Sequence, residues 1–117
     1  MLLGLRTTIY PAPDLHAATR WWAEVLGVEP YFEEPFYVGF SVGGYELGLD
    51  PNAEVADGGV AFWGVPDCAA AHAQLLAAGA TAHSDVREVG EGIRVATVRD
   101  AAGSVVGLIE NPHFAAD

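Results

Sequence analysis

Residues 7–14 read Thr-Thr-Ile-Tyr-Pro-Ala-Pro-Asp, and residues 60–67 read Val-Ala-Phe-Trp-Gly-Val-Pro-Asp. Each stretch is a short run typical of a strand that leads to a Pro-Asp pair. An alanine-rich segment follows each pair and stops at a glycine, Gly27 or Gly79. An aspartate suits a helix N-cap, where its carboxylate accepts free backbone N–H groups, and a glycine suits the left-handed position just past a helix. The chain therefore repeats one strand–helix unit after about half of its 117 residues.

Strand-like runs follow both predicted helices. Residues 36–42 and 45–49 flank Gly43-Gly44, which is a signal for a two-residue hairpin. Residues 93–99 and 105–109 flank residues 100–103, which predict a four-residue hairpin loop, and further strands are predicted at 29–33 and 84–89. The order of elements is βαβββ twice, an α+β layout in which the helices cover one face of the sheet.

Length and charge narrow the classes of function. A chain of 117 residues fits a single domain, made here of two half-modules at about 4–52 and 57–112. Sixteen acidic residues against five arginines give a net charge of −11, which disfavours nucleic acid and anionic membranes as partners. The single cysteine, Cys68, and the lack of a predicted leader or membrane span favour the cytoplasm. The positive mean hydropathy predicts a homodimer, in which a second copy covers apolar surface.

The ordered motifs resemble the vicinal oxygen chelate superfamily, which includes glyoxalase I, bleomycin-resistance proteins and extradiol dioxygenases. Residues 13–28, with Pro-Asp-Leu, Trp22 and Val-Leu-Gly-Val, are similar to the Asp-Leu-x-x-Ala…Tyr…Leu-Gly helix of that family. Residues 99–110, Arg-Asp-Ala-Ala-Gly-Ser-Val-Val-Gly-Leu-Ile-Glu, are similar to its Asp-Pro-x-Gly-Asn-x-x-Glu-Leu hairpin. The resemblance implies two βαβββ modules whose mixed sheet curls around a cavity, and a dimer in most members.

The resemblance also implies four metal-ligand positions in the enzymes of the family. Counted from the capping aspartates and the hairpin glycines, these positions are occupied here by Thr7, Gly48, Val60 and Gly107. None of them offers the imidazole, thiolate or carboxylate that a divalent cation prefers. We therefore expect no metal and no other cofactor. The four histidines supply no replacement: His16 and His72 fall on helices, His83 in a loop and His113 in the tail.

The residues expected to line the cavity follow from strand alternation and hairpin pairing. If Gly48 faces the cavity, Tyr37, Ser41 and Glu46 share its face. The predicted ligand-binding residues are Thr7, Ile9, Tyr37, Ser41, Glu46, Gly48, Val60, Phe62, Arg94, Val105 and Gly107. This lining is apolar and aromatic with Glu46 and Arg94 as its charged groups, and the two glycines leave space for a ligand. Equally, Glu46 and Arg94 could pair with each other or face water.

Four functions remain open at this point. The first is a metal-free protein that binds a small molecule, such as an antibiotic or a cationic metabolite, without chemistry. The second is a metal-free enzyme in which Glu46 acts as general base and Arg94 stabilises an oxyanion. The third is a metal-dependent lyase, isomerase or dioxygenase, against which the ligand positions argue, and the fourth is a structural module. The acidic surface favours the first, because it attracts cationic ligands.

Overall fold

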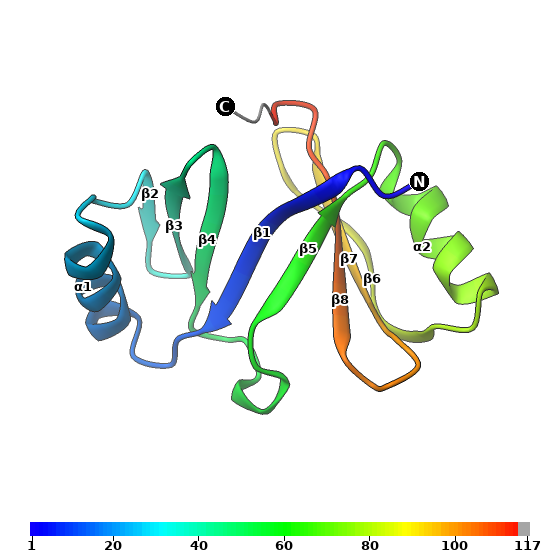
Figure 1. The fold of residues 1–117 in the computed structure, drawn as a ribbon, viewed down its shortest axis with the longest axis horizontal. Coiled ribbons are helices and arrows are strands. Elements are labelled where there is room, and N and C mark those ends of the chain that lie inside the picture. Colours follow the sequence, from blue (N-terminus) through cyan, green and yellow to red (C-terminus); the bar gives the residue numbers. More distant parts are fainter. Residues whose placement is uncertain (115–117) are drawn as a thin grey trace. The chain divides into compact units, whose positions relative to one another are not determined.

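The fold was determined as a computed structural model, and residues 1–114 are described (Figure 1). Its elements in chain order are β1 (Gly4–Pro11), α1 (Leu15–Leu26), β2 (Phe32–Glu34), β3 (Tyr37–Val42), β4 (Tyr45–Asp50), the 3₁₀ turn η1 (Val55–Asp57), β5 (Val60–Gly64), α2 (Cys68–Ala77), β6 (Thr81–Gly90), β7 (Ile93–Arg99) and β8 (Val105–Glu110). The α+β class with βαβββ repeated is thereby confirmed. Neither helix of this part of the chain is long and apolar enough to cross a membrane.

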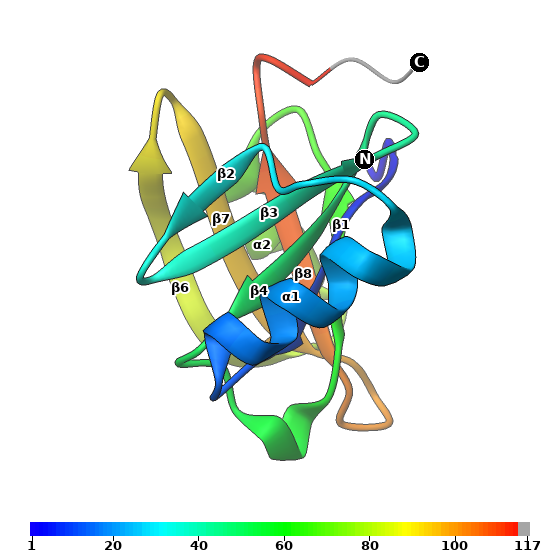
Figure 2. The ribbon, with the colours of Figure 1, turned by 90° about the vertical axis from the view of Figure 1, so that its left-hand side faces the viewer.

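The chain divides into two compact units. One is Thr7–Gly59, and the other joins Met1–Arg6 to the residues from Val60 onward, here called the 60–114 unit. Within the first unit the strands neighbour one another in the order β2-β3-β4-β1, and within the second in the order β5-β8-β7-β6. The pairs β1–β4 and β5–β8 are parallel, whereas the hairpin pairs are antiparallel. Each unit therefore has a mixed four-strand layer with one helix, as Figure 2 shows for α1.

The expected helix ends are present. The side chain of Asp14 accepts a hydrogen bond from the backbone N–H of Ala17 at 3.1 Å, and that of Asp67 does the same for Ala70 at 3.1 Å. Gly27 ends α1 in the left-handed conformation, with φ of 73°. These caps satisfy backbone groups that the helices leave free, which gives both Pro-Asp signals and Gly27 a direct structural cause. The C-cap of α2 is Ala78, and Gly79 follows it with φ of 107°.

In the Thr7–Gly59 unit, the predicted hairpin register is confirmed. Val42 pairs with Tyr45, Ser41 with Glu46 and Gly39 with Gly48. The opposite side chains form the core beneath α1, where Val38, Phe40 and Leu49 are almost completely buried and Leu47 packs against them. Alternation along the predicted 36–42 strand would place Phe36 on this face, but Phe36 precedes β3 and is 62% exposed.

In the 60–114 unit, the predicted register of the second hairpin is wrong by one residue. Gly107 pairs with Thr97, and Arg94 pairs with Glu110. Ala96 and Leu108 are buried in one cluster with Cys68 and Ala71 of α2 and with Val65, so their face is the one that α2 covers. Strand alternation places Arg94 on that same face, because it lies two residues from Ala96. Arg94 therefore does not share a face with Gly107, contrary to expectation.

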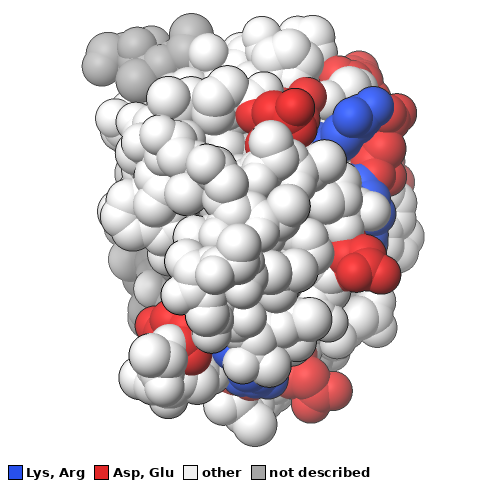
Figure 3. Space-filling model, turned by 90° about the vertical axis from the view of Figure 1, so that its right-hand side faces the viewer, with Lys and Arg blue, Asp and Glu red and all other residues white. Residues whose placement is uncertain are grey.

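The face around α2 also shows how unevenly the charge is distributed. The ten residues of α2 include no acidic or basic side chain apart from His72. Figure 3 shows this side of the molecule, where uncharged side chains form a broad area and the acidic and arginine side chains gather towards its margins.

The two phenylalanines of the first hairpin region provide a matched test of the core. Replacing Phe40, which is completely buried, by alanine should lower the free energy of unfolding by about 3–5 kcal/mol, because a large cavity is left in the core. The same change at exposed Phe36 should lower it by no more than about 0.5 kcal/mol. Urea unfolding followed by tryptophan fluorescence measures both, and equal losses would contradict the assigned faces of the sheet.

Candidate functional site

The face of each sheet layer that its own helix does not cover, here called the helix-free face, carries most of the predicted site residues. In the Thr7–Gly59 unit, Thr7 is the parallel partner of Glu46, and Ile9 is that of Gly48. The register of the hairpin adds Ser41 opposite Glu46. Six predicted residues therefore share this face: Thr7, Ile9, Tyr37, Ser41, Glu46 and Gly48.

Three hydroxyl groups converge on the carboxylate of Glu46. The Thr7 hydroxyl donates to Oε1 at 3.2 Å, and the Tyr37 hydroxyl donates to the same oxygen at 2.9 Å. The Tyr31 hydroxyl donates to Oε2. Thr7 is buried and Glu46 is half-buried, so these donors replace water that the carboxylate loses on folding. Glu46 thus forms the centre of a hydroxyl–carboxylate cluster.

Tyr31 is the member of this cluster that the sequence did not indicate. It precedes β2, and its backbone N–H donates to the carbonyl of Gly39 at 3.0 Å. A Cβ at Gly39 would lie 3.0 Å from Cε1 of Tyr31 and 2.8 Å from Oε2 of Glu46. A side chain at position 39 would therefore displace one of them, and this glycine on the same face is the sequence signal for the cluster.

The two tyrosines act as permanent donors. Burial, the hydrogen bond to Glu46 and its negative charge raise the pKa of Tyr31 well above its usual value. Burial, followed by the charge of Glu46, raises the pKa of Tyr37 further. Both phenols consequently stay protonated at neutral pH and keep donating to the carboxylate. Within the Thr7–Gly59 unit the one arginine, Arg20, pairs with Glu29, so the charge of Glu46 is hydrogen-bonded and has no cationic partner in its own unit.

The two glycines at the ligand positions do not leave the open space that we expected. The Tyr37 side chain covers Gly48, and a Cβ there would lie 2.6 Å from Cζ of that ring. In the 60–114 unit the Phe62 ring covers Gly107, and a Cβ there would lie 2.5 Å from the ring. Each glycine therefore makes room for an aromatic ring of its own unit.

The ligand positions of the metal-dependent enzymes do not fit a metal in this chain. Thr7 already donates its hydroxyl to Glu46, Val60 has no donor atom, and rings cover the two glycines. Within residues 1–114, no three histidine, cysteine, aspartate or glutamate side chains come together as a possible cation site. The donor set and the ring positions thus disagree with the metal site that the fold family implies.

The remaining predicted residues belong to the 60–114 unit. Phe62 is the parallel partner of Gly107, and alternation adds Val60 and Val105 to the same helix-free face. Arg94 lies on the opposite face, as described above. The prediction that Arg94 shares a face with Val105 and Gly107 in the ligand-binding lining is therefore wrong.

Cys68 is a packing residue at the start of α2. It is completely buried, and its backbone N–H donates to a carboxylate oxygen of Glu110 at 2.9 Å. Burial, and then the charges of Glu110 and Asp67, raise the pKa of the thiol to about 11, although Arg94 acts in the opposite direction. These effects outweigh the helix N-terminus, which would lower the pKa.

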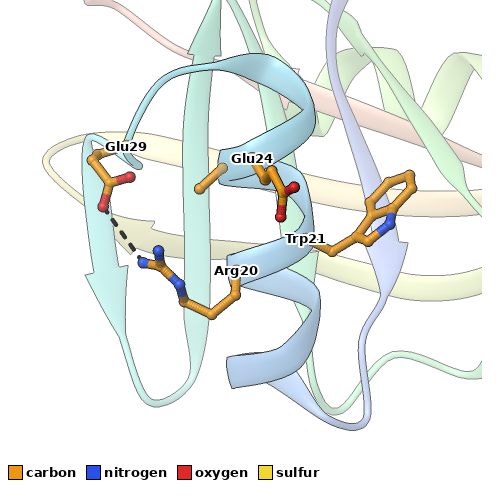
Figure 4. A pocket seen from close by; sticks show the side chains of 5 residues that line it. Arg20, Trp21, Glu24 and Glu29 are labelled. Atoms are coloured by element: carbon orange, nitrogen blue, oxygen red, sulfur yellow. Dashed lines mark ion pairs between the residues drawn. The ribbon is translucent and has the colours of Figure 1, made fainter.

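A shallow surface depression lies beside α1 (Figure 4). It is lined by Arg20, Trp21, Ala23, Glu24 and Glu29. The ion pair between Arg20 and Glu29, at 3.7 Å, joins two side chains that are mostly exposed, and such pairs contribute little energy. The depression offers no converging polar groups comparable to those around Glu46.

The chain matches the Glyoxalase/Bleomycin resistance protein/Dioxygenase superfamily over residues 4–108 and therefore belongs to it. No curated protein sequence matches it.

Among solved structures, a methylmalonyl-CoA epimerase variant of Streptomyces coelicolor in complex with 2-nitronate-propionyl-CoA is 17% identical, with a TM-score of 0.77 over the whole of both chains. The methylmalonyl-CoA epimerase of Mycobacterium tuberculosis is 20% identical, with a TM-score of 0.71 over 93% of this chain and 88% of the other. A superfamily member from Vibrio splendidus 12B01 is 16% identical, with a TM-score of 0.68 over 92% and 99%. These likenesses show the fold.

The thiol provides a test of the packing around α2. With a pKa of about 11, roughly one Cys68 side chain in a thousand is a thiolate at pH 8, and the side chain is also inaccessible. We expect Ellman's reagent to leave native protein unmodified over minutes and to react with one thiol per chain in urea. Rapid modification of the native protein would contradict this assignment.

Proposed function

We propose that the protein binds a small organic cation on the helix-free face of its Thr7–Gly59 unit, without a metal and without chemical conversion. The observation that carries the proposal is the Glu46 carboxylate, which has three hydroxyl donors and no cationic partner within the Thr7–Gly59 unit. A half-buried negative charge that the protein leaves unneutralised favours a positive ligand group.

Aromatic side chains next to Glu46 support the same ligand class. Tyr31 and Tyr37 touch the carboxylate through their hydroxyls, and the Phe32 ring lies 6.3 Å from that of Tyr37 between centroids. Ring faces attract organic cations, by about 0.5–2 kcal/mol per ring. The net charge of −11 adds a long-range attraction for cations. The charge, the rings and the donors thus all favour a cation with apolar substituents.

Sequestration of an antibiotic or a cationic metabolite is the biological role that this chemistry fits best. The superfamily to which the chain belongs includes bleomycin-resistance proteins by its own description. A binding role needs no group that performs chemistry, and the hydroxyls around Glu46 are fixed donors.

A second candidate is an enzyme that uses Glu46 as a proton acceptor. The likeness to methylmalonyl-CoA epimerases favours it, since those proteins bind acyl-CoA compounds. One feature weighs against it: Arg94, which we had expected to stabilise an oxyanion, lies on the face of its own unit that α2 covers.

Calorimetric titration with two probes of similar shape and opposite charge, benzyltrimethylammonium and benzoate, tests the binding proposal, with bleomycin as a larger cation. We expect the cations to bind and benzoate not to. Glu46→Gln should weaken cation binding about tenfold or more, because a charged partner is lost. Added Mg²⁺ or Zn²⁺ should leave the affinity unchanged.

Glu33→Gln is the matched control, because it removes the same charge from the α1-facing side of β2, where Glu33 pairs with Val38. Its effect should stay within about twofold, as expected for an exposed charge. Tyr37→Phe keeps the ring and removes one hydrogen-bond donor to Glu46. It therefore tests what the cluster contributes to cation binding even if Glu46→Gln is unstable. Equal losses in Glu46→Gln and Glu33→Gln, or tight binding of benzoate, would overturn the proposal.

Incubation with methylmalonyl-CoA in D₂O separates the enzyme from the binding protein. We expect no exchange of the substrate α-hydrogen, followed by proton NMR, beyond that seen with Glu46→Gln. Exchange by the wild-type protein that Glu46→Gln abolishes would instead establish the enzyme.

A further inference from the structure

The pairing of edge strand β6 with β7 shifts at three places, between Ala82 and Ser84, between Ser84 and Arg87, and between Glu88 and Gly90; the first shift brings polar side chains together. Along β6 the pairing with β7 advances from Ala82–Val98 to Ser84–Thr97, which leaves His83 as an extra residue. This is a β-bulge, a feature that bends a strand and redirects side chains, and that occurs often beside functional sites. Here it directs two successive residues of β6 towards one residue of β7.

The redirected side chains meet at the hydroxyl of Thr97. Nδ1 of His83 lies 2.7 Å from Oγ1 of Thr97, and Oγ of Ser84 lies 2.6 Å from the same atom. Thr97 has one hydrogen to donate and two lone pairs that accept, so at most one neighbour accepts from it and at least one donates to it. The three groups therefore form a hydrogen-bonded chain, and its two ends, Nε2 of His83 and Oγ of Ser84, retain capacity for another partner.

The guanidinium of Arg87 lies on the same face of the sheet as Thr97. Thr97 pairs with Gly107, and so lies on the helix-free face of the 60–114 unit. Two residues along β7, Val95 pairs with Arg87, which places Arg87 on that face as well. Arg87 is exposed and forms no ion pair with any described residue. Val86 packs into the cluster beneath α2, as expected if Arg87 faces the other way.

We propose that His83, Ser84 and Arg87 form a binding site for a small oxyanion, a carboxylate or a phosphate group, with Thr97 as the positioning residue. In the imidazolium form of His83 both ring nitrogens carry a hydrogen: Nδ1–H donates to Thr97, Thr97 donates to Ser84, and the Ser84 hydroxyl is free to donate outward. His83 Nε2–H, the Ser84 hydroxyl and the Arg87 guanidinium then offer donors to one anion. Charge-assisted hydrogen bonds of this kind are about twice as strong as neutral ones.

This site differs from the Glu46 cluster in residues, unit and ligand charge. The adjacent Asp85 is exposed and opposes an anion, and the net charge of −11 does so at longer range. At physiological ionic strength the screening length is about 8 Å, so the nearby donors outweigh the distant carboxylates. Removal of the Asp85 charge should therefore strengthen binding.

Titration of ¹⁵N-labelled protein with inorganic phosphate, and separately with acetate, tests the site and distinguishes the two anions. We expect saturable shifts of the His83 ring nitrogens and of the Ser84 and Thr97 amides for at least one of them. Arg87→Gln and Thr97→Val should each weaken binding about tenfold, and Asp85→Asn should tighten it. Because Arg87 is exposed, Arg87→Gln keeps the proposal testable if Thr97→Val fails to fold.

Arg94→Gln is the matched control, since it removes the same charge from the other face of β7. It should leave the affinity within about twofold of the wild type, as for a screened charge. The proposal is overturned if neither anion shifts the His83 resonances, or if Arg94→Gln weakens binding as much as Arg87→Gln does. In that event the bulge serves only to protect the edge of the sheet.

Discussion

Each unit has one helix for one sheet layer, and this constraint governs the rest of the structure. A strand sends alternate side chains to opposite faces, so a layer covered on one side by a helix needs apolar residues at every second position. Phe40 and Leu49 meet α1 in this way, and Ala96 and Leu108 meet α2. The residues between them point away from the helix and form the helix-free face. Register therefore decides which residues reach the helix-free face, and a slip of one residue exchanges the two sets.

This dependence on register explains how far the sequence could be interpreted. In the first hairpin, Gly43-Gly44 forms a two-residue loop with positive φ at both positions, and this loop leaves one possible pairing. Tyr37 and Glu46 were therefore placed on one face correctly. In the second hairpin, the Asp100 N–H donates to the carbonyl of Ser104 at 3.0 Å, so Ser104 belongs to the turn. Five residues, not four, then separate the pair Arg99–Val105, and Arg94 moves to the other face.

Other features have no counterpart in local sequence patterns. A glycine in a strand indicates that something approaches closely, but its identity depends on tertiary contacts. At Gly48 it is the Tyr37 ring and at Gly107 the Phe62 ring, where we had expected room for a ligand. The bulge at His83 is likewise set by pairing across β6 and β7, and we had assigned His83 to a loop. Helix caps were predictable because they depend on residues three apart, whereas these contacts join segments far apart in the chain.

The repeat in the sequence thus repeats the backbone elements, but the polar side chains on the helix-free faces differ between the two units. By the internal correspondence of Gly48 with Gly107, the position of Glu46 in the second unit is occupied by Val105. The first unit gathers hydroxyls around a carboxylate, and the second unit has Arg87 and a histidine–hydroxyl chain on its own helix-free face. The apolar positions under α1 and α2 are constrained by packing, so substitution there costs stability. The helix-free positions lie outside these two clusters, and there the two copies of one backbone carry different side chains, a carboxylate at Glu46 and an aliphatic group at Val105.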